Sequence, residues 1–346
     1  MPTQAHAPRR ATRFTAVFQL AAVAALAIGL SGCGVVFDES AAPSTECAPG
    51  ATLIGASASD LQQALDEALP GDVLQLSATT YSGEFTVTTS GTASAPITLC
   101  SSNDATISPQ STSTGYGLHL DHADYWKLDG FSITGGKKGI MLDASSHNEL
   151  TNLKVSGTGE EGIHLRTHSS DNIVSSSTIH DTGLSNPEFG EGIYVGSAES
   201  NWCRYTECQP DRSDRNVLTR NHVYDVAAEA IDIKEGTGDG TISENTLSTP
   251  ETTTVDSVVD IKGSGWTARE NRISAALGAG IQVHRVNADS GAQNVITANT
   301  FDVAASQYAI EIAGAAQSAG NTVTCDNAIV DSTASAPSNI ACSPNR

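Results

Sequence analysis

The chain has 346 residues, a formal net charge of −21 at pH 7 and 39% hydrophobic residues. This apolar content is enough for a sizeable core and excludes a disordered chain. The acidic balance argues against a nucleic-acid partner, and it means that an anionic ligand has to be held by local cations or by bound metal. Aromatic residues make up only 5%, whereas Gly, Ser, Thr, Ala and Asn are abundant, which favours stacked β-structure over a helical bundle.

The first 32 residues predict a bacterial lipoprotein signal peptide. Three arginines precede an apolar run over residues 14–30, and the sequence Leu30-Ser31-Gly32-Cys33 resembles a lipobox. We expect cleavage after residue 32, lipidation of Cys33 and a tether over residues 33–46. The protein would then be extracytoplasmic, held at the membrane of the bacterial cell envelope by its lipid. A plain secretory signal or a short anchor helix is the alternative, although the apolar run is short for a membrane span.

The cysteine content fits an oxidising compartment. Besides Cys33 there are six cysteines, and proximity along the chain predicts three disulfides, although the sequence alone permits other pairings. The predicted pairs are Cys47–Cys100, Cys203–Cys208 and Cys325–Cys342. A cysteine metal site is the rival interpretation, but no CxxC pair is present.

An amphipathic helix is predicted over residues 60–69, in the sequence DLQQALDEAL. Asp60 is a suitable N-cap, and Pro70-Gly71 ends the helix. Its apolar face consists of Leu61, Leu65, Ala68 and Leu69. We expect this helix to cap the N-terminal end of a repeat domain over residues 47–346, and residues 325–346 to close the other end.

A strand motif recurs eight times between residues 117 and 313. Each copy has a small residue, then two aliphatic residues that alternate with other residues, and successive copies begin 22 to 38 residues apart. A second apolar motif lies between copies, as in NVLTRNHV (216–223) and NVITANTF (294–301). The short joints leave no room for crossover helices, so strands in the same phase must stack in parallel about 4.8 Å apart. The predicted fold is an all-β, single-stranded, right-handed parallel β-helix.

Asparagines recur at one place in the second motif, two residues before its last aliphatic. These are Asn221, Asn245, Asn271 and Asn299. We expect an internal ladder in which the stacked amides satisfy one another.

The residues beside the two aliphatics of each strand motif are expected to face solvent. The column between the aliphatics reads His119, Met141, His164, Tyr194, Asp232, Asp260, Gln282 and Glu311. The column after them reads Asp121, Asp143, Arg166, Gly196, Lys234, Lys262, His284 and Ala313. Two insertions, residues 182–191 and 196–215, flank the strand around Ile193 and are expected to wall one side of a groove over this strip.

Stacking places Lys262 one strand spacing from Lys234, and Asp260 equally close to Asp232. Two neighbouring ammonium groups lower each other's pKa, which can release a neutral amine as a base. The aspartates oppose this shift, so an inert salt-bridged ladder is the alternative interpretation.

The phrases QQALDEALPGDVLQL and EAIDIKEGTGDGTISENTL resemble β-helical polysaccharide lyases of the alginate lyase and chondroitinase B type, and more loosely pectate lyases. The resemblance implies that Lys234 removes the C5 proton of a uronic acid, and that Glu229 helps to hold calcium. Glu191 and Glu161 occupy the corresponding position on earlier coils and are further candidate calcium ligands. The chain departs from the family at Ala227, where a second acid is expected, and at Lys262, where an arginine is expected.

The resemblance also implies β-elimination on a polysaccharide. We expect the protein to be a monomer. Calcium or Arg166 would neutralise the substrate carboxylate, and Lys262, Tyr194 or His284 would protonate the departing oxygen. The expected substrate contacts along the strip are Arg166, His164, Asp232, Asp260 and Gln282.

Two other functions compete with a lyase. Asp232 and Asp260 could place their carboxyls at the roughly 5 Å of a retaining glycoside hydrolase pair. A non-catalytic glycan-binding or surface scaffold module is the third possibility, because the fold alone does not choose among them.

Overall fold

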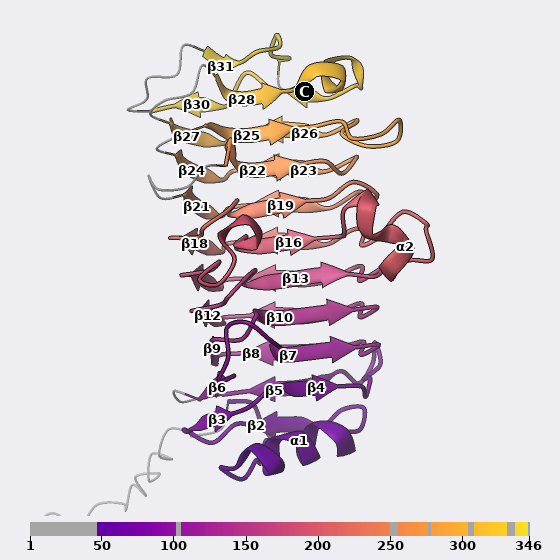
Figure 1. Ribbon diagram of the computed structural model, residues 1–346, viewed down its shortest axis with the longest axis vertical. Helices are drawn as coiled ribbons and strands as arrows, with labels where there is room; N and C mark the ends of the chain where they lie inside the picture. The colour runs from indigo at the N-terminus through magenta and orange to yellow at the C-terminus, as the bar shows by residue number, and fades with distance from the viewer. Residues whose placement is uncertain are drawn as a thin grey trace, which may run out of the picture. The chain divides into compact units, whose positions relative to one another are not determined.

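The computed structural model describes residues 47–101, 105–249, 255–275, 278–303, 308–330 and 336–344. The described chain is an all-β, right-handed parallel solenoid of about ten coils, as predicted, and its three sheets run along its length (Figure 1). The signal peptide, Cys33 and the tether lie outside the described residues. Within the described residues, no helix is long and apolar enough to cross a membrane.

Each coil contributes one strand to each sheet. Sheet A contains β1 (Thr52–Leu53), β2 (Val73–Gln75), β5 (Ile97–Cys100), β8 (Trp126–Asp129), β11 (Glu149–Thr151), β14 (Ile173–Ser175), β17 (Val217–Thr219), β20 (Thr241–Ser243), β23 (Thr267–Arg269), β26 (Val295–Thr297) and β29 (Thr322–Val323). Sheet B contains β3 (Thr80–Ser82), β6 (Thr106–Ser108), β9 (Ser132–Thr134), β12 (Lys154–Ser156), β15 (Thr178–His180), β18 (His222–Tyr224), β21 (Thr246–Thr249), β24 (Arg272–Ala275), β27 (Thr300–Val303) and β30 (Ala328–Ile329). Sheet C contains β4 (Phe85–Val87), β7 (Tyr116–Asp121), β10 (Lys138–Asp143), β13 (Ile163–Arg166), β16 (Ile193–Val195), β19 (Ile231–Ile233), β22 (Ser257–Ile261), β25 (Ala279–Val283), β28 (Tyr308–Ile312) and β31 (Ala336–Ser338).

Sheet C is built from the predicted strand motif. Its strands stack in register, so that Ile163 pairs with Ile193 and Ile231 with Val259, and all four side chains are fully buried. Burying an aliphatic side chain of this size contributes about 1.5–3 kcal/mol. The repeated inward aliphatics therefore hold the coils together and fix the register of the residues between them.

The predicted asparagine ladder is present. The Oδ1 atom of Asn245 accepts hydrogen bonds from the backbone N–H and Nδ2 of Asn221, at 2.8 and 3.1 Å. The same pattern continues through Asn271 and Asn299 to Asn327. A second ladder, not predicted from the sequence, runs through Asn148, Asn172 and Asn216, each of which directly precedes a strand of sheet A.

The capping helix α1 (Ala58–Glu67) begins and ends earlier than predicted. Its N-cap is Ser57, not Asp60: Ser57 Oγ accepts from the Asp60 N–H, and the Asp60 carboxylate accepts from the Ser57 N–H. Both residues thus form a capping box, which satisfies two backbone donors. Leu61, Leu65 and Ala68 are buried as expected, whereas Leu69 follows the helix and is 66% exposed.

The three predicted disulfides, Cys47–Cys100, Cys203–Cys208 and Cys325–Cys342, are all formed. Cys325–Cys342 ties the last described segment to the final coils, as expected for a C-terminal closure. The remaining helices are short: α2 (Trp202–Tyr205), η1 (Pro187–Phe189), η2 (Glu199–Asn201) and η3 (Gly314–Ser318).

Candidate active site

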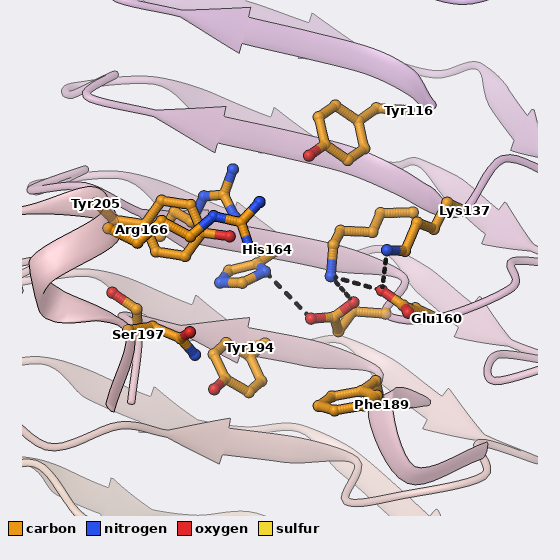
Figure 2. A pocket seen from close by; sticks show the side chains of 13 residues that line it. Tyr116, Lys137, Glu160, His164, Arg166, Phe189, Tyr194, Ser197 and Tyr205 are labelled. Carbon is orange, nitrogen blue, oxygen red and sulfur yellow. Dashed lines mark hydrogen bonds and ion pairs between the residues drawn. The ribbon is translucent and has the colours of Figure 1, made fainter. Parts of the chain in front are cut away.

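A pocket of about 320 Å³ opens on sheet C over β10, β13 and β16. The two insertions stand on opposite sides of it, with Phe189 of the first facing Tyr205 of the second across the opening (Figure 2). The prediction that both insertions wall one side was therefore wrong. Strand β16 enters the sheet between the insertions, so one precedes it and the other follows it at the opposite edge. The lining consists of Tyr116, Lys137, Lys138, Glu160, Glu161, His164, Arg166, Phe189, Tyr194, Ser197, Asn201, Arg204 and Tyr205.

An ion-pair network lies at one side of the pocket floor. Lys138 pairs with both Glu161 and Glu160, and its Nζ is 3.2 Å from Glu160 Oε2. Lys137 Nζ is 3.4 Å from the same oxygen. Burial raises the pKa of the Glu161 carboxyl, but His164 and Lys138 outweigh burial and bring that pKa to about 2. Glu161 is thus ionised and paired with a cation of the pocket, and it does not belong to the group of carboxylates that could hold a metal ion.

His164 lies in the centre of the floor. Its Nε2 donates to the Gly196 carbonyl oxygen at 2.9 Å, and burial lowers the pKa of the ring. Its Nδ1 is 3.2 Å from Glu161 Oε1 and pairs with that carboxylate when the ring is protonated. Because Nδ1 is inaccessible to solvent, His164 is better placed to fix the Tyr194 ring, whose centroid is 4.4 Å from its own, than to exchange a proton with substrate.

Arg166 lies at the other side of the floor. Its Nε and Nη2 donate to the two oxygens of Asp143 at 2.6 and 3.0 Å. Its guanidinium carbon is 4.0 Å from the centroid of the Tyr205 ring. Burial opposes the charge of Arg166, but Asp143 outweighs burial and raises the pKa of the guanidinium further. Arg166 is therefore a fixed cation whose charge is balanced by one carboxylate.

Three carboxylates meet where β16 and β19 begin. Oxygens of Glu191, Glu229 and Asp232 lie within 4.8 Å of one another, and Glu191 Oε2 is buried without a hydrogen-bond partner. Burial and mutual repulsion raise the pKa of Glu191 well above its usual range, and burial followed by repulsion from Asp232 raises that of Glu229 to about 7. An orphaned buried oxygen among repelling carboxylates fits a hard divalent cation with oxygen ligands. Two of the three predicted ligands are thus together, but Asp232, predicted as a substrate contact, replaces Glu161.

The strip further along sheet C is a salt-bridged ladder. Lys234 Nζ is 2.5 Å from Asp232, Lys262 bridges Asp232 at 3.1 Å and Asp260, and His284 Nδ1 is 3.1 Å from Asp260. Burial lowers the pKa of both lysines, but the carboxylates outweigh burial and raise it above the usual value. Without a bound metal, Lys234 is therefore charged and not the neutral amine that ammonium repulsion alone would produce.

The strip is also less exposed than predicted. Met141 is fully buried, and Asp232 and Asp260 are only 1% and 3% exposed, because neighbouring coils and their long side chains cover them. Gln282 is buried as well and donates to Glu311 at 3.3 Å. Of the predicted catalytic and substrate residues, the pocket lining includes only His164, Arg166 and Tyr194.

Lys234 links the ladder to the pocket. Its Nζ lies 4.9 Å from the centroid of the Tyr194 ring, whose pKa is raised well above its usual range by burial and by Asp232. Lys262 and His284 lie one and two coils further along. Tyr194 and Lys234 are thus the two groups of the strip that carry a transferable proton beside the pocket.

Several aromatic and basic residues that line the pocket were not predicted from the sequence, because they lie outside the two columns of outward residues in the strand motif. Lys137 and Lys138 precede the second copy of the strand motif, and Phe189, Arg204 and Tyr205 belong to the insertions. A basic pair directly before a strand, and aromatic residues in insertions beside a charged strip, are the signals that could have identified them.

Comparison with known proteins identifies the family. Residues 42–198 match the family described as the Pel9A-like right-handed β-helix region. An alginate lyase from Paenibacillus sp. FPU-7 shares 36% identity, superposes with a TM-score of 0.74, and the match covers 82% of this chain and 96% of that one. The chain belongs to the β-helical polysaccharide lyase-like family.

Other members of this family are more distant. The pectate lyase PEL9 of Emericella nidulans is 28% identical over 139 residues, which is 35% of this chain and only 34% of that protein. This chain thus matches about a third of the length of that relative. Pectate lyase Pel9A has a TM-score of 0.58 at 14% identity, over 81% of this chain and 72% of its own, and supports the fold alone.

Proposed function

We propose that this protein is an extracytoplasmic lyase that cleaves a uronic-acid polysaccharide by β-elimination. The observation that carries the proposal is a cationic and aromatic pocket whose floor holds Tyr194, next to Lys234 and to the carboxylate cluster of Glu191, Glu229 and Asp232. The similarity to an alginate lyase over nearly all of that protein's length supports the same chemistry.

The pocket charge suits an anionic sugar. Four Lys or Arg residues line it against two glutamates, although the chain as a whole is strongly acidic. The rings of Tyr116, Phe189 and Tyr205 offer apolar faces for sugar rings at its edges. Lys138 and Arg166 are the buried cations on the two sides of the floor, and their N–H groups would donate to the substrate carboxylate and so make the adjacent C5 proton more acidic.

The proton transfers are assigned to Lys234 and Tyr194. Lys234 takes the C5 proton, the C5 electrons form the C4–C5 double bond, and the C4–O bond breaks. Tyr194 donates its proton to the departing glycosidic oxygen, since burial and nearby carboxylates keep the phenol protonated. The proton then returns from Lys234 to Tyr194 through solvent, and no water is consumed.

Glu191, Glu229 and Asp232 are the residues that would hold calcium in this site. When bound, a divalent cation there would oppose the negative charges that keep Lys234 protonated. Without it, only the small deprotonated fraction of Lys234 can act as the base.

A glycoside hydrolase at Asp232 and Asp260 has less support. A general acid needs a raised carboxyl pKa, whereas His284 and Lys262 outweigh burial and lower that of Asp260. Both carboxylates are bound to the same Lys262 ammonium, which holds them as ion-pair partners.

The envelope location is part of the proposal. It is supported by the lipobox-like sequence at Cys33 and by three disulfides, which persist in oxidising compartments. Lipidation would hold the protein at the membrane as a monomer, and labelling with radioactive palmitate in wild type and Cys33→Ala cells tests it.

The activity is tested by incubating the protein with alginate, pectate, chondroitin and neutral glycans, with and without a chelator. We expect new ultraviolet absorbance from an unsaturated sugar end with one of the uronic-acid polymers, and a loss of that absorbance in Tyr194→Phe. Reducing ends without absorbance would indicate hydrolysis, and binding without either product would indicate a non-catalytic module. Both results contradict a lyase.

A further inference from the structure

The insertion 196–215 forms a rigid wall of the pocket. It carries Arg204, a cation that forms no ion pair with any described residue. Its helix α2 places Arg204 and Tyr205 at the pocket edge, where α2 stands beside β16 and β19 (Figure 1). The question is what fixes this wall and what its exposed cation binds.

Asp211 fixes the wall to the sheet. Its side chain is fully buried, and its carboxylate accepts from the N–H groups of Thr167 and His168, both at 2.9 Å. It also accepts from the hydroxyls of Ser197 at 2.6 Å and Ser213 at 2.8 Å. Thr167 and His168 directly follow Arg166 and have φ angles of 57° and 68°, so their N–H groups converge on one anion. Asp211 thus joins the insertion to the turn that carries Arg166.

Other contacts make the wall stiff. Trp202 is buried and donates its Nε1–H to the Ser197 carbonyl at 2.9 Å, and Glu235 accepts from the Glu199 N–H at 2.6 Å. The Cys203–Cys208 disulfide closes the turn that contains Arg204. The wall is therefore formed before any ligand arrives, which reduces the entropy that binding has to overcome.

Arg204 differs from the other cations of the pocket. Arg166 is balanced by Asp143, and Lys137 and Lys138 are balanced by Glu160 and Glu161. Arg204 is exposed, lies 5.0 Å from the Tyr205 ring centroid, and forms no ion pair with any described residue. A guanidinium that is held over an aromatic ring and lacks a carboxylate partner is suited to a planar anion.

We propose that Arg204 binds the carboxylate of a second uronic acid, next to the sugar whose C5 proton is removed, and that Asp211 is its positioning residue. This inference rests on the proposed function for the identity of the ligand. It makes the insertion a specificity element: a polymer with a carboxylate on adjacent sugars gains a contact that a neutral glycan or a single uronic acid lacks.

The test measures affinity and turnover separately for Arg204→Gln, with Arg220→Gln as the matched control. Arg220 is also exposed and lies outside the pocket, so the control removes the same charge from the same acidic chain. We expect Arg204→Gln to raise KM and the dissociation constant for the cleaved uronic-acid polymer about tenfold, as for one charge-assisted contact, with kcat within twofold and a weaker dependence on salt. Arg220→Gln should match the wild type.

The role of Asp211 is tested by a double-mutant cycle with Asp211→Asn, which keeps the size of the side chain. If Asp211 acts by positioning Arg204, Asp211→Asn alone should weaken binding several-fold but weaken it little further in the Arg204→Gln background. Equal effects in both backgrounds would show a general structural role and overturn this assignment.

The outcomes separate this inference from the lyase proposal. If the wild type binds a uronic-acid polymer without cleaving it and Arg204→Gln weakens that binding, the inference stands and the lyase proposal fails. If cleavage is observed and Arg204→Gln behaves as the control does, the lyase stands and the inference is overturned. Absence of binding to every uronic-acid polymer overturns both.

Discussion

Two stretches of sheet C have the same backbone and very different chemistry. Over β10, β13 and β16 the outward side chains line an open pocket, whereas over β19, β22 and β25 they form a closed ladder of lysines and aspartates. The strands in both stretches pair in the same register. The difference comes from the insertions, whose residues Phe189, Arg204 and Tyr205 form walls over the first stretch. A β-helix of this kind thus repeats its scaffold on every coil but forms a pocket only where the coil is interrupted.

The largest effect is expected when Lys234 and Lys262, which occupy equivalent places on adjacent coils, are replaced one at a time. We expect Lys234→Ala to lower kcat/KM by about 10²–10⁴, the usual contribution of a general base, and Lys262→Ala to lower it less than tenfold per folded molecule. Steady-state rates from ultraviolet absorbance, corrected for folded protein by circular dichroism, decide this. Similar losses in both variants would mean that the ladder and the pocket act as one site.

The pH profile provides a second test. Because the carboxylates raise the pKa of Lys234, the base is mostly protonated at neutral pH, so kcat/KM should rise about tenfold per pH unit between pH 7 and 9. Added calcium should shift the rise to lower pH. A rate that falls over this interval would instead assign Lys234 as the proton donor.

The part of the ladder beyond Lys234, which contains Asp260, Lys262 and His284, is expected to matter for stability and not for turnover. Asp260→Asn leaves the half-buried Lys262 ammonium with one carboxylate partner fewer, so we expect a loss of up to about 3 kcal/mol in the free energy of unfolding and activity within threefold of wild type. Urea denaturation at pH 7 measures the first quantity. An activity loss as large as that of Lys234→Ala would favour the hydrolase.

The carboxylate cluster predicts an unusual pH dependence. A folded-state pKa of about 7 for Glu229, above its ordinary 4.5, means that its stabilising contribution is complete below about pH 4.5 and is lost as the pH rises to about 7. Glu229→Gln should therefore be more stable than wild type at pH 8 without metal, by about 2–3 kcal/mol, and equal to it near pH 4.

Added calcium tests whether Glu229 is a metal ligand. It should raise the Tm of the wild type at pH 8 and leave Glu229→Gln unchanged, while the exposed Glu244→Gln should respond as the wild type does. Thermal melts by circular dichroism measure these shifts. A calcium response that survives in Glu229→Gln would place the metal elsewhere.

The smallest effect is expected at an exposed ion pair on sheet A. Lys127 Nζ lies 3.1 Å from Glu149 Oε2, with side chains 42% and 45% exposed. Glu149→Gln should cost less than about 1 kcal/mol, and 1 M salt should remove the difference, because solvent and ions screen the pair. If Glu149→Gln lowered the free energy of unfolding as much as Asp260→Asn does, burial would not explain why the ion pairs of the ladder stabilise the protein more.

The sequence by itself determined the solenoid. Alternation of aliphatic residues, a repeat of 22 residues or more and the asparagines from Asn221 to Asn299 are local patterns that recur from coil to coil. The disulfides follow proximity along the chain. For this reason the strands of sheet C, the first ladder and the disulfides were all predicted correctly.

Only the tertiary structure decided which polar residues meet. Period-2 alternation shows that Asp232 points away from the core, but not that neighbouring coils bury it or that Lys234 and Lys262 both bind its carboxylate. The path of the insertions set Phe189 opposite Tyr205 and docked Asp211 behind Arg166. These contacts join residues far apart in the sequence through irregular backbone, where no repeat fixes the direction of the chain, so the walls of the pocket could not be derived from the motif that predicted its floor.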